Sequence, residues 1–419
     1  MKVLIVGGGA REHALAWKIA QSPRVAALLV APGNPGTASV PRCRNVAVPV
    51  HDIEGLCRLA HAERVDLTVV GPEIPLALGL VERFAAEGLR CFGPTREAAE
   101  IETSKVFSKT FMERHHIPTS RFATVTTMAE AERVLARWPM PAVIKADGLA
   151  AGKGVVIAKL REDARSAVRD MLEGDVLGAA GRRVVIEEFV SGEELSFIVM
   201  TGHGQVLVLA DSRDHKRRDD GDRGPNTGGM GAYSPVPGSD AWTSRILSEI
   251  IMPAVRGLAA EGRPYTGFLY AGLMIHQDRL SVLEFNCRLG DPETQVILPR
   301  LRSDLVPLIE AALDGGLAQS VADWDPRTAV TVVLASAGYP GTCRLGVPIH
   351  GAAEVERDTL VFHAGTAMGS EGLVTSGGRV LCVSALDDSL AKARTKAYRA
   401  IGHIAFDGAF CRRDIGLVT

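Results

Sequence analysis

The sequence has few aromatic residues, no long apolar run and almost no net charge. Aromatic side chains make up 5% of the 419 residues. No stretch of about 18 consecutive apolar residues occurs, which excludes a transmembrane helix. The apolar start of the chain is too short for a secretion signal and indicates a first strand. Lys and Arg total 47 against 49 Asp and Glu, a balance that argues against binding nucleic acid or an anionic membrane through bulk charge.

Paired cysteines are also lacking. The seven cysteines are odd in number and widely spaced, and no C-x-x-C motif occurs. This pattern excludes a disulfide framework and a zinc ribbon, and it is typical of a reducing compartment. We therefore expect a cytoplasmic protein.

Glycine, by contrast, is plentiful, with 44 residues. Because a single core rarely grows beyond roughly 250–300 residues, this chain is expected to form several domains. Residues 1–103 alternate apolar strands with helices, which predicts a parallel sheet covered on both faces. Four of these strands end in glycine-containing turns, and the carboxyl ends of parallel strands are where ligands bind.

The first of these turns, Gly7-Gly8-Gly9, resembles a dinucleotide-binding loop but departs from its pattern. Glu12 stands where the third glycine is required, and the second strand ends at Ala31-Pro32 instead of at an acidic residue. Both departures argue against NAD. A glycine loop that opens a helix can still bind a phosphate or carboxylate through free N–H groups. A purely structural turn is the alternative.

In the rest of the chain, the pattern of predicted strands and helices changes twice. Predicted strands at 142–146, 155–158, 184–189 and 195–200, with one helix, form a small α+β unit. Further strands and helices continue to a boundary at Trp324–Pro326. A β-rich part then begins at residue 328 and closes with an amphipathic helix. The expected fold class is therefore α/β with several domains.

A glycine-rich loop that contains Lys153 follows the predicted strand that contains Lys145. The stretch Lys145–Gly154 is not a Walker A motif, because Gly154 stands where Ser or Thr is required and a strand follows. Such a loop between two strands can fold over phosphates, with Lys145 and Lys153 as point charges. The alternative is a flexible hairpin with solvated lysines.

Two further segments are weaker signals. An apolar strand ends in the acidic stretch Glu187–Glu193, whose carboxylates could accept ribose hydroxyls, although a solvated turn is the common alternative. The segment Asp211–Pro235 is predicted to be a loop, and structureless loops of about 25 residues are usually functional or disordered. Its glycines favour close approach to a ligand, whereas Arg218–Arg223 is predicted to be a solvated tip.

The strongest local signal is the stretch LEFNCRLGDPE, residues 283–293. In a strand, Glu284 and Asn286 project to the same face. Two oxygen ligands on one face suit Mg²⁺, which binds few protein carboxylates together with substrate phosphates. Arg288 lies close enough to stabilise an anionic transition state. A structural salt-bridge strand is the alternative.

Taken in order along the chain, these motifs resemble the glycinamide ribonucleotide synthetase family, phosphoribosylamine–glycine ligases of the ATP-grasp superfamily. The resemblance covers essentially the whole chain. It is carried by GGGAREH, APGNPG, VGPE, IKADGLAAGKGV, IEEFVSGEE, SRDHKR, GPNTGGMGAYSP, YTGFLYAGLM and EFNCRLGDPE, and near the C-terminus by ASAGYPG, FHAGT and TSGGRVLCV.

The resemblance implies a reaction. ATP phosphorylates the carboxylate of glycine, and the amine of 5-phosphoribosylamine attacks the acyl phosphate. The products are glycinamide ribonucleotide, ADP and phosphate, in purine biosynthesis. The implied ligands are ATP and Mg²⁺ or Mn²⁺. The implied partners are small molecules alone, and a monomer is expected.

The resemblance also implies a domain plan. An N-terminal α/β substrate-binding domain, the parallel-sheet pre-ATP-grasp domain, is expected at 1–103. A two-part ATP-grasp domain is expected at 104–327, with a small lid subdomain at about 122–192. A small β-rich C-terminal domain is expected at 328–419.

By the same resemblance, residues that match the family's motifs are expected to share one site. Those expected to bind ATP are Lys105, Lys145, Gly152, Lys153, Glu187, Glu188, Phe189, Val190 and Glu193. Glu284 and Asn286 are expected to hold the metal, and Arg288, Asp214 and Lys216 are expected to act in catalysis. The expected substrate residues are Gly9, Asn34, Gly36, Glu73, Asn226, Gly228 and Asp291.

Two departures and two competing interpretations remain open. ATP-grasp folds often place an extra acidic metal ligand on the strand before E-x-N, but Tyr270–Ile275 contains no acid. Ala10 stands where the family usually has glycine. The competing interpretations are another ATP-grasp carboxylate–amine ligase or carboxylase, and a nucleotide-binding regulator without turnover. The first would lack GPNTGGMGAYSP, and the intact lysine pair and E-x-N-x-R argue against the second.

Overall fold

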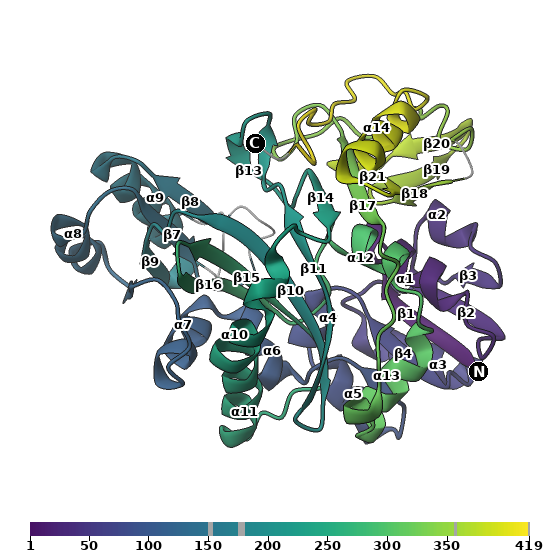
Figure 1. The fold of residues 1–419 in the computed structure, drawn as a ribbon, viewed down its shortest axis with the longest axis horizontal. Coiled ribbons are helices and arrows are strands. Elements are labelled where there is room, and N and C mark those ends of the chain that lie inside the picture. The colour runs from purple at the N-terminus through teal and green to yellow at the C-terminus, as the bar shows by residue number, and fades with distance from the viewer. Residues whose placement is uncertain (150–153, 175–180, 356–357, 418–419) are drawn as a thin grey trace.

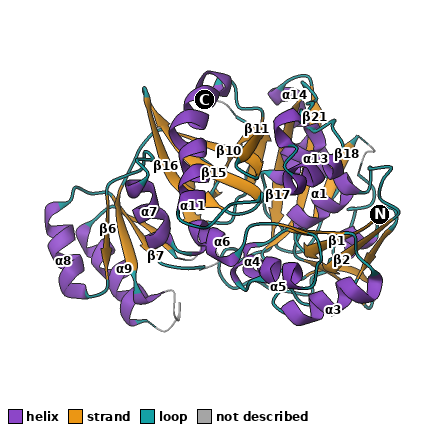
Figure 2. Cartoon of the chain, turned by 90° about the horizontal axis from the view of Figure 1, so that it is seen from below, coloured by secondary structure: helices purple, strands orange, loops and turns teal. Residues whose placement is uncertain are grey.

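The structure, a computed structural model, describes residues 1–149, 154–174, 181–355 and 358–417. The predicted loop residues Gly152 and Lys153 lie outside the described residues. Three structural units follow one another along the chain: an N-terminal unit, a central unit that includes a small lid unit, and a C-terminal unit that begins near residue 328. The ribbon in Figure 1 shows the purple N-terminal unit and the yellow C-terminal unit on the same side. The small lid unit lies on the opposite side in both views (Figures 1 and 2).

The N-terminal unit contains a five-stranded, wholly parallel sheet in the order β3-β2-β1-β4-β5. Its strands are β1 (Lys2–Gly7), β2 (Ala27–Pro32), β3 (Cys43–Asn45), β4 (Leu67–Val70) and β5 (Cys91–Phe92). The central strand β1 is fully buried from Val3 to Val6 because helices cover both faces. The helices are α1 (Ala10–Ile19), α2 (Pro35–Ala38), α3 (Ile53–Glu63), α4 (Glu73–Ala77) and α5 (Leu80–Ala86).

Helices α4 and α5 are separated by a short break. Helix α4 ends at Ala77 and α5 begins at Leu80. Gly79 between them has a φ of +83°, a left-handed conformation that glycine adopts without a steric penalty. Glu73 lies in the first turn of α4, three residues after strand β4 ends at Val70.

The lid unit is a four-stranded antiparallel sheet with its own core. Its order is β6-β9-β7-β8, made of β6 (Phe122–Val125), β7 (Ala142–Ala146), β8 (Val155–Ala158) and β9 (Val184–Glu188). Helices α8 (Met128–Arg137) and α9 (Arg161–Glu173) supply buried apolar residues to this core. Helices α6 (Arg96–Thr103) and α7 (Lys105–Arg114) lead into it.

An eight-stranded antiparallel sheet forms the rest of the molecule, in the order β16-β15-β10-β11-β14-β17-β21-β18. Its strands are β10 (Glu193–Gly202), β11 (Gln205–Asp214), β14 (Gly231–Ser234), β15 (Gly267–His276), β16 (Arg279–Asn286), β17 (Thr328–Ala335), β18 (Thr359–His363) and β21 (Arg379–Asp387). Strand β14 pairs with β17, with Gly231 opposite Val332. The sheet therefore runs continuously from the central unit into the C-terminal unit.

Short helices and two hairpins complete the chain. The helical segment 243–260 consists of α10 (Thr243–Ile246), a π-helical segment (Leu247–Ile251) and α11 (Met252–Ala260). The other helices of this part are α12 (Thr294–Arg300), α13 (Leu305–Asp314) and α14 (Leu390–Ile401), and short 3-10 turns lie at Ser239–Trp242 and Leu317–Gln319. The hairpins pair β12 (Arg217–Asp219) with β13 (Arg223–Asn226), and β19 (Thr366–Gly369) with β20 (Gly372–Thr375).

The segment Asp211–Pro235 is not the structureless loop that its composition predicted. Strand β11 extends to Asp214, the hairpin β12–β13 follows, and β14 joins the large sheet. The reason is long-range: Arg412 donates to the Asp222 carboxylate and to the backbone carbonyl of Arg217. A contact with residues almost 200 positions away cannot be inferred from local turn chemistry.

The predicted α/β multidomain fold is confirmed. All seven cysteines are free thiols. No helix in the described residues is both long and apolar enough to cross a membrane.

Candidate active site

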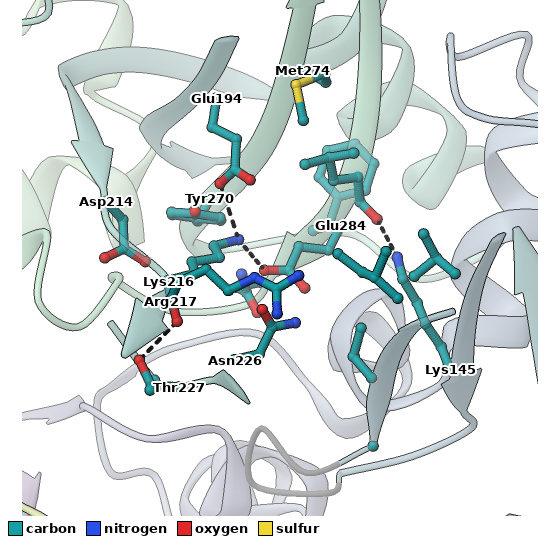
Figure 3. A pocket seen from close by; sticks show the side chains of 18 of the residues that line it. Lys145, Glu194, Asp214, Lys216, Arg217, Asn226, Thr227, Tyr270, Met274 and Glu284 are labelled. Atoms are coloured by element: carbon teal, nitrogen blue, oxygen red, sulfur yellow. Dashed lines mark hydrogen bonds and ion pairs between the residues drawn. The ribbon is translucent and has the colours of Figure 1, made fainter. Parts of the chain in front are cut away.

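A cavity of about 1270 Å³ lies where the three units meet. Sixteen of the predicted site residues line its wall, one from the N-terminal unit and fifteen from the part of the chain between residues 105 and 291. They are Glu73, Lys105, Lys145, Glu187, Glu188, Phe189, Val190, Glu193, Asp214, Lys216, Asn226, Gly228, Glu284, Asn286, Arg288 and Asp291. The view of Figure 3 places Glu284 between Lys145 and Asp214. We call the side with Lys105, Lys109 and Lys145 the lysine end, and the side with Asp214, Arg288 and Asp291 the aspartate end.

The lysine end is built around a buried carboxylate. Lys145 on β7 lies 2.8 Å from Glu187 on β9 and donates to the Leu283 carbonyl at 3.1 Å. Lys109 on α7 lies 2.7 Å from the same carboxylate. Burial raises the pKa of Glu187, but the two lysines outweigh it and lower that pKa below its usual value. Glu187 therefore holds Lys145 against the strand with its amine toward the cavity.

The segment Asp147–Gly148, which follows strand β7, is fixed to the start of α7. Ser104 caps this helix by accepting from Phe107 N–H, and its hydroxyl donates to Asp147 at 3.0 Å. Lys105 donates to the Gly148 carbonyl at 2.8 Å. Burial lowers the pKa of Lys105. Two lysines of the lysine end, Lys105 and Lys109, are thus four residues apart on one helical face.

The acidic strand end divides into a buried and an exposed part. Glu187 is 2% exposed and its carboxylate is taken by Lys109 and Lys145, so it does not lie free for ribose hydroxyls. Glu188 and Phe189 are exposed at the cavity mouth. Glu193 is exposed as well and pairs with Arg213 at 2.5 Å. These three residues, together with the half-buried Val190, are open to a ligand at the mouth.

Glu284, Lys216 and Glu194 form a charge cluster in the middle of the cavity (Figure 3). The Lys216 amine lies 3.3 Å from the Glu284 carboxylate and 4.0 Å from that of Glu194. Lys216, assisted by Lys145 and Lys105, lowers the pKa of Glu284 to about 2. Burial alone would lower the pKa of Lys216, but Glu284, Tyr270 and Glu194 hold it well above its usual value.

Glu284 and Asn286 fit a divalent cation. Both line the cavity, as the strand parity predicted, and the low pKa of Glu284 keeps its carboxylate ionised. No group of three or more His, Cys, Asp or Glu side chains suited to a metal occurs in the described part of the chain. A cation held by these two oxygens would need phosphate and water as further ligands. Mg²⁺ is usually coordinated in this way in proteins.

Arg288 is held between two carboxylates. Its guanidinium lies 2.7 Å from Glu102 and 3.4 Å from Glu73, and it donates to the Asn286 side chain at 3.3 Å. Glu102 also accepts from Cys287 N–H at 2.7 Å. Burial raises the pKa of Glu102, although Arg288 opposes this. The arginine is therefore fixed beside the predicted metal ligand.

Asp214 at the aspartate end has an unsatisfied carboxylate oxygen. Its Oδ1 is buried and has no hydrogen-bond partner. Burial, and then the neighbouring Glu293, raise the pKa of Asp214 well above its usual value. Asp291 is satisfied instead, by Gln295 at 2.7 Å and Arg379 at 3.2 Å. Asp214 lines the cavity, and an unpaired buried acceptor beside a cavity suits a ligand that donates hydrogen bonds.

Three predicted substrate residues lie outside the cavity wall. Asn34 is 6% exposed, and its amide donates to the carbonyls of Gly8 and His363 while its oxygen caps α2. A Cβ on Gly36 would lie 2.4 Å from the His13 ring. Gly9 donates to Glu12 at 2.6 Å. The structure thus gives Asn34 and Gly36 protein partners and does not bring these residues together with the rest.

Several wall residues were not predicted from the sequence. They are Arg11, Glu102, Lys109, Glu194, Tyr270, Glu293, Tyr339 and Arg379. The i, i+4 spacing of Lys105 and Lys109 was a signal for Lys109. Arg379 lies in the stretch TSGGRVLCV, which carried part of the resemblance. No local pattern points to Glu102, which reaches Arg288 from 186 residues away.

Family models for phosphoribosylglycinamide synthetase match this chain in three consecutive parts. The N domain matches residues 1–102, the ATP-grasp (A) domain residues 103–294 and the C domain residues 329–418. The chain belongs to the phosphoribosylglycinamide synthetase family. The resemblance read from its motifs is therefore confirmed, and so is the expectation that its central part is an ATP-grasp domain.

Curated members of the family match over nearly their whole length. A phosphoribosylamine–glycine ligase of Allochromatium vinosum is 56% identical over 419 residues, which cover 99% of this chain and 98% of that protein. One of Escherichia coli is 55% identical, with the same shares covered. The chain is therefore a ligase of this family, as expected.

Solved structures match in fold. A phosphoribosylamine–glycine ligase of Thermotoga maritima has a TM-score of 0.84 at 34% identity, with 99% of this chain and 100% of that chain covered. A biotin carboxylase domain of Hydrogenobacter thermophilus, in complex with MgADP, has a TM-score of 0.73 at 16% identity, with 98% of this chain and 91% of that chain covered. The second likeness shows the shared fold alone.

Proposed function

We propose that this enzyme joins glycine to 5-phosphoribosylamine and converts ATP to ADP and phosphate, with glycinamide ribonucleotide as its product. The observation that carries the proposal is one cavity in which lysines at one end and an unpaired aspartate at the other flank Glu284. The family's curated members carry the same activity in their names.

The lysine end is the proposed site of the ATP phosphates. Lys145 and Lys105 present two cations to the cavity, and ammonium groups bind phosphates as point charges. Glu188, Phe189, Val190 and Glu193 at the mouth are the proposed contacts of the nucleoside, with the ring of Phe189 available to stack on the base. Gly152 and Lys153 are proposed on the family motif alone, since they lie outside the described residues.

Glu284 and Asn286 are the proposed ligands of Mg²⁺ or Mn²⁺. When bound, such an ion would neutralise phosphate charge and orient the terminal phosphoryl group. The low pKa of Glu284 keeps this ligand anionic at neutral pH. Lys216, 3.3 Å from Glu284, is placed to neutralise the carboxylate of glycine as it attacks the phosphoryl group.

The aspartate end is the proposed site of the two amines. Asp214 offers an unpaired oxygen to an amino group, and Arg288 lies beside Asn286 to stabilise charge on the acyl phosphate. Glu73, Asn226, Gly228 and Asp291 complete the proposed substrate wall. No covalent enzyme intermediate is needed, so positioning and electrostatics carry the catalysis.

Steady-state phosphate release tests the proposal. Purified enzyme with ATP and Mg²⁺ should release phosphate at full rate only when glycine and phosphoribosylamine are both present, and mass spectrometry should detect glycinamide ribonucleotide. Turnover that depends on bicarbonate instead of glycine would favour a carboxylase. Nucleotide binding without any turnover would favour a regulator and contradict the proposal.

A cytoplasmic location, a monomeric state and the exclusive use of small-molecule partners stay predictions from the sequence. Light scattering of the purified enzyme, with and without ATP and Mg²⁺, measures the oligomeric state directly. A mass of twice the 44.5 kDa of the chain would contradict the expected monomer.

A further inference from the structure

Two side chains of the C-terminal unit that line the cavity wall, Tyr339 and Arg379, contact the same glycine. Arg379, the first residue of β21, donates to the Gly228 carbonyl at 2.6 Å. The Tyr339 hydroxyl accepts from Gly228 N–H at 2.9 Å. Both backbone polar groups of Gly228 are therefore satisfied by the C-terminal unit, whereas Gly228 itself belongs to the central unit.

Arg379 also contacts the turn that follows strand β16. It donates to the Asp291 backbone carbonyl at 2.7 Å, and its guanidinium lies 3.2 Å from the Asp291 carboxylate. One side chain thus joins the segment 226–229 to the segment 290–292. A guanidinium group suits this task because its planar fork directs several donors at fixed angles.

The glycines of this segment are explained by these contacts. A Cβ on Gly228 would lie 3.0 Å from the Arg379 guanidinium carbon, which is closer than real Cβ contacts normally come. A Cβ on Gly229 would lie 2.4 Å from Pro292 and 2.7 Å from the unpaired Asp214 Oδ1. The segment is therefore packed between Arg379 on one side and Asp214 on the other.

A second set of hydrogen bonds connects this segment to Lys216 in the middle of the cavity. Thr227 donates through its hydroxyl to the Lys216 carbonyl at 2.9 Å, as Figure 3 shows, and Thr227 N–H donates to the same carbonyl. A shift of Gly228 would be transmitted to Thr227 and so to Lys216, which pairs with Glu284.

We propose that Arg379 is a positioning residue: it fixes the Gly228 and Asp291 walls against each other, so that Asp214 and Lys216 face the reacting groups. Tyr339 supports it through Gly228 N–H. This inference rests on the proposed function, because it assigns the aspartate end to glycine and phosphoribosylamine. The C-terminal unit would then complete the amine side of the site and leave the lysine end to the other units.

The test is to compare Arg379→Ala, Arg379→Lys and Tyr339→Phe with a control. The control is Arg344→Ala in the same unit, where Arg344 is 76% exposed and pairs with Asp407. Arg379→Ala should lower kcat/KM for glycine and phosphoribosylamine by about 10- to 100-fold, the size expected of a small misplacement. The Kd of a non-hydrolysable ATP analogue, read by calorimetry, should change by less than about twofold, because the lysine end is independent of Arg379.

The milder variants test the same inference with smaller structural changes. Arg379→Lys keeps the charge but loses the fork, so it should recover only part of the lost kcat/KM. Tyr339→Phe removes one acceptor and should cost about fivefold, the value of one hydrogen bond. If Arg379→Ala does not fold, these two variants test the inference in its place. Their kcat/KM for glycine and phosphoribosylamine should fall while the Kd of the ATP analogue stays unchanged.

Two results would overturn the inference. Kinetic constants of Arg379→Lys and Tyr339→Phe equal to those of Arg344→Ala would mean that the contacts position nothing. A parallel loss of ATP affinity and of kcat/KM for the other substrates would mean a general structural role. Failure of the proposed function is distinct from both, since it would be seen as absence of glycinamide ribonucleotide with the wild-type enzyme.

Discussion

The two ends of the cavity differ in how many parts of the chain build them. At the lysine end, Lys145 and Glu187 come from neighbouring strands of one small sheet, and Lys109 comes from the helix that leads into it. At the aspartate end, Arg288 is held by Glu73 of the N-terminal unit, and Asp291 by Arg379 of the C-terminal unit. On the proposed function, the end that binds the nucleotide is built locally, whereas the end that aligns the two further substrates draws on all three units.

The largest effect is expected where the two ends meet, at Glu284. Glu284→Ala removes the proposed anionic metal ligand and leaves Lys216 without its nearest partner, so turnover should fall by about a thousandfold. Steady-state rates at increasing Mg²⁺ measure the loss, and circular dichroism checks the fold. Glu113→Ala, at an exposed position on α7, is the matched control. Unchanged activity and metal dependence would make Glu284 merely structural.

A smaller effect, confined to ATP, is expected at the lysine end. Lys145→Ala leaves Glu187 paired with Lys109 alone, and kcat/KM for ATP should fall by about a hundredfold as a phosphate contact is lost. The KM values for glycine and phosphoribosylamine should stay close to those of the control Lys392→Ala, an exposed lysine on α14. A rise in the KM values of all three substrates would contradict the assignment of the lysine end to ATP alone.

At the aspartate end, a substitution should lower kcat and leave ATP affinity unchanged. Glu102→Gln keeps an acceptor for Cys287 N–H but removes the charge that holds Arg288, and kcat should fall by about tenfold. The Kd of an ATP analogue should not change. If ATP affinity falls with kcat instead, Arg288 serves the nucleotide and not the acyl transfer.

The smallest effect is a pH dependence of stability. The folded-state pKa of Glu284 is about 2, below its usual 4.5, so its ionisation contributes stability that is fully present above pH 4.5 and is lost as the pH falls toward 2. The difference in free energy of unfolding between wild type and Glu284→Gln should be constant above about pH 4.5 and shrink below it. Urea denaturation at several pH values measures it, and a difference that stays the same from pH 5 to pH 3 would contradict the assignment.

The difference between local and long-range contacts explains which parts of the site the sequence could predict. The strand parity of Glu284 and Asn286 and the lysine of β7 are local features, and periodicity places them correctly. Glu102, Tyr339 and Arg379 reach the cavity through contacts over more than 80 residues, as Arg379 does to Asp291, so no local pattern could reveal them. The loop predicted at 211–235 fails for the same reason, because Arg412 near the C-terminus holds its hairpin.

The central claim is that Glu284 joins the two ends, so that the phosphoryl group passes from ATP at the lysine end to the carboxylate of glycine. The most direct measurement uses glycine labelled with ¹⁸O in its carboxylate, followed by mass spectrometry of the released phosphate. One labelled oxygen should appear in each phosphate, because the acyl phosphate loses that oxygen to the phosphate when the amine attacks. Label that stays wholly in the carbonyl of glycinamide ribonucleotide or in free glycine, with unlabelled phosphate, would contradict the account.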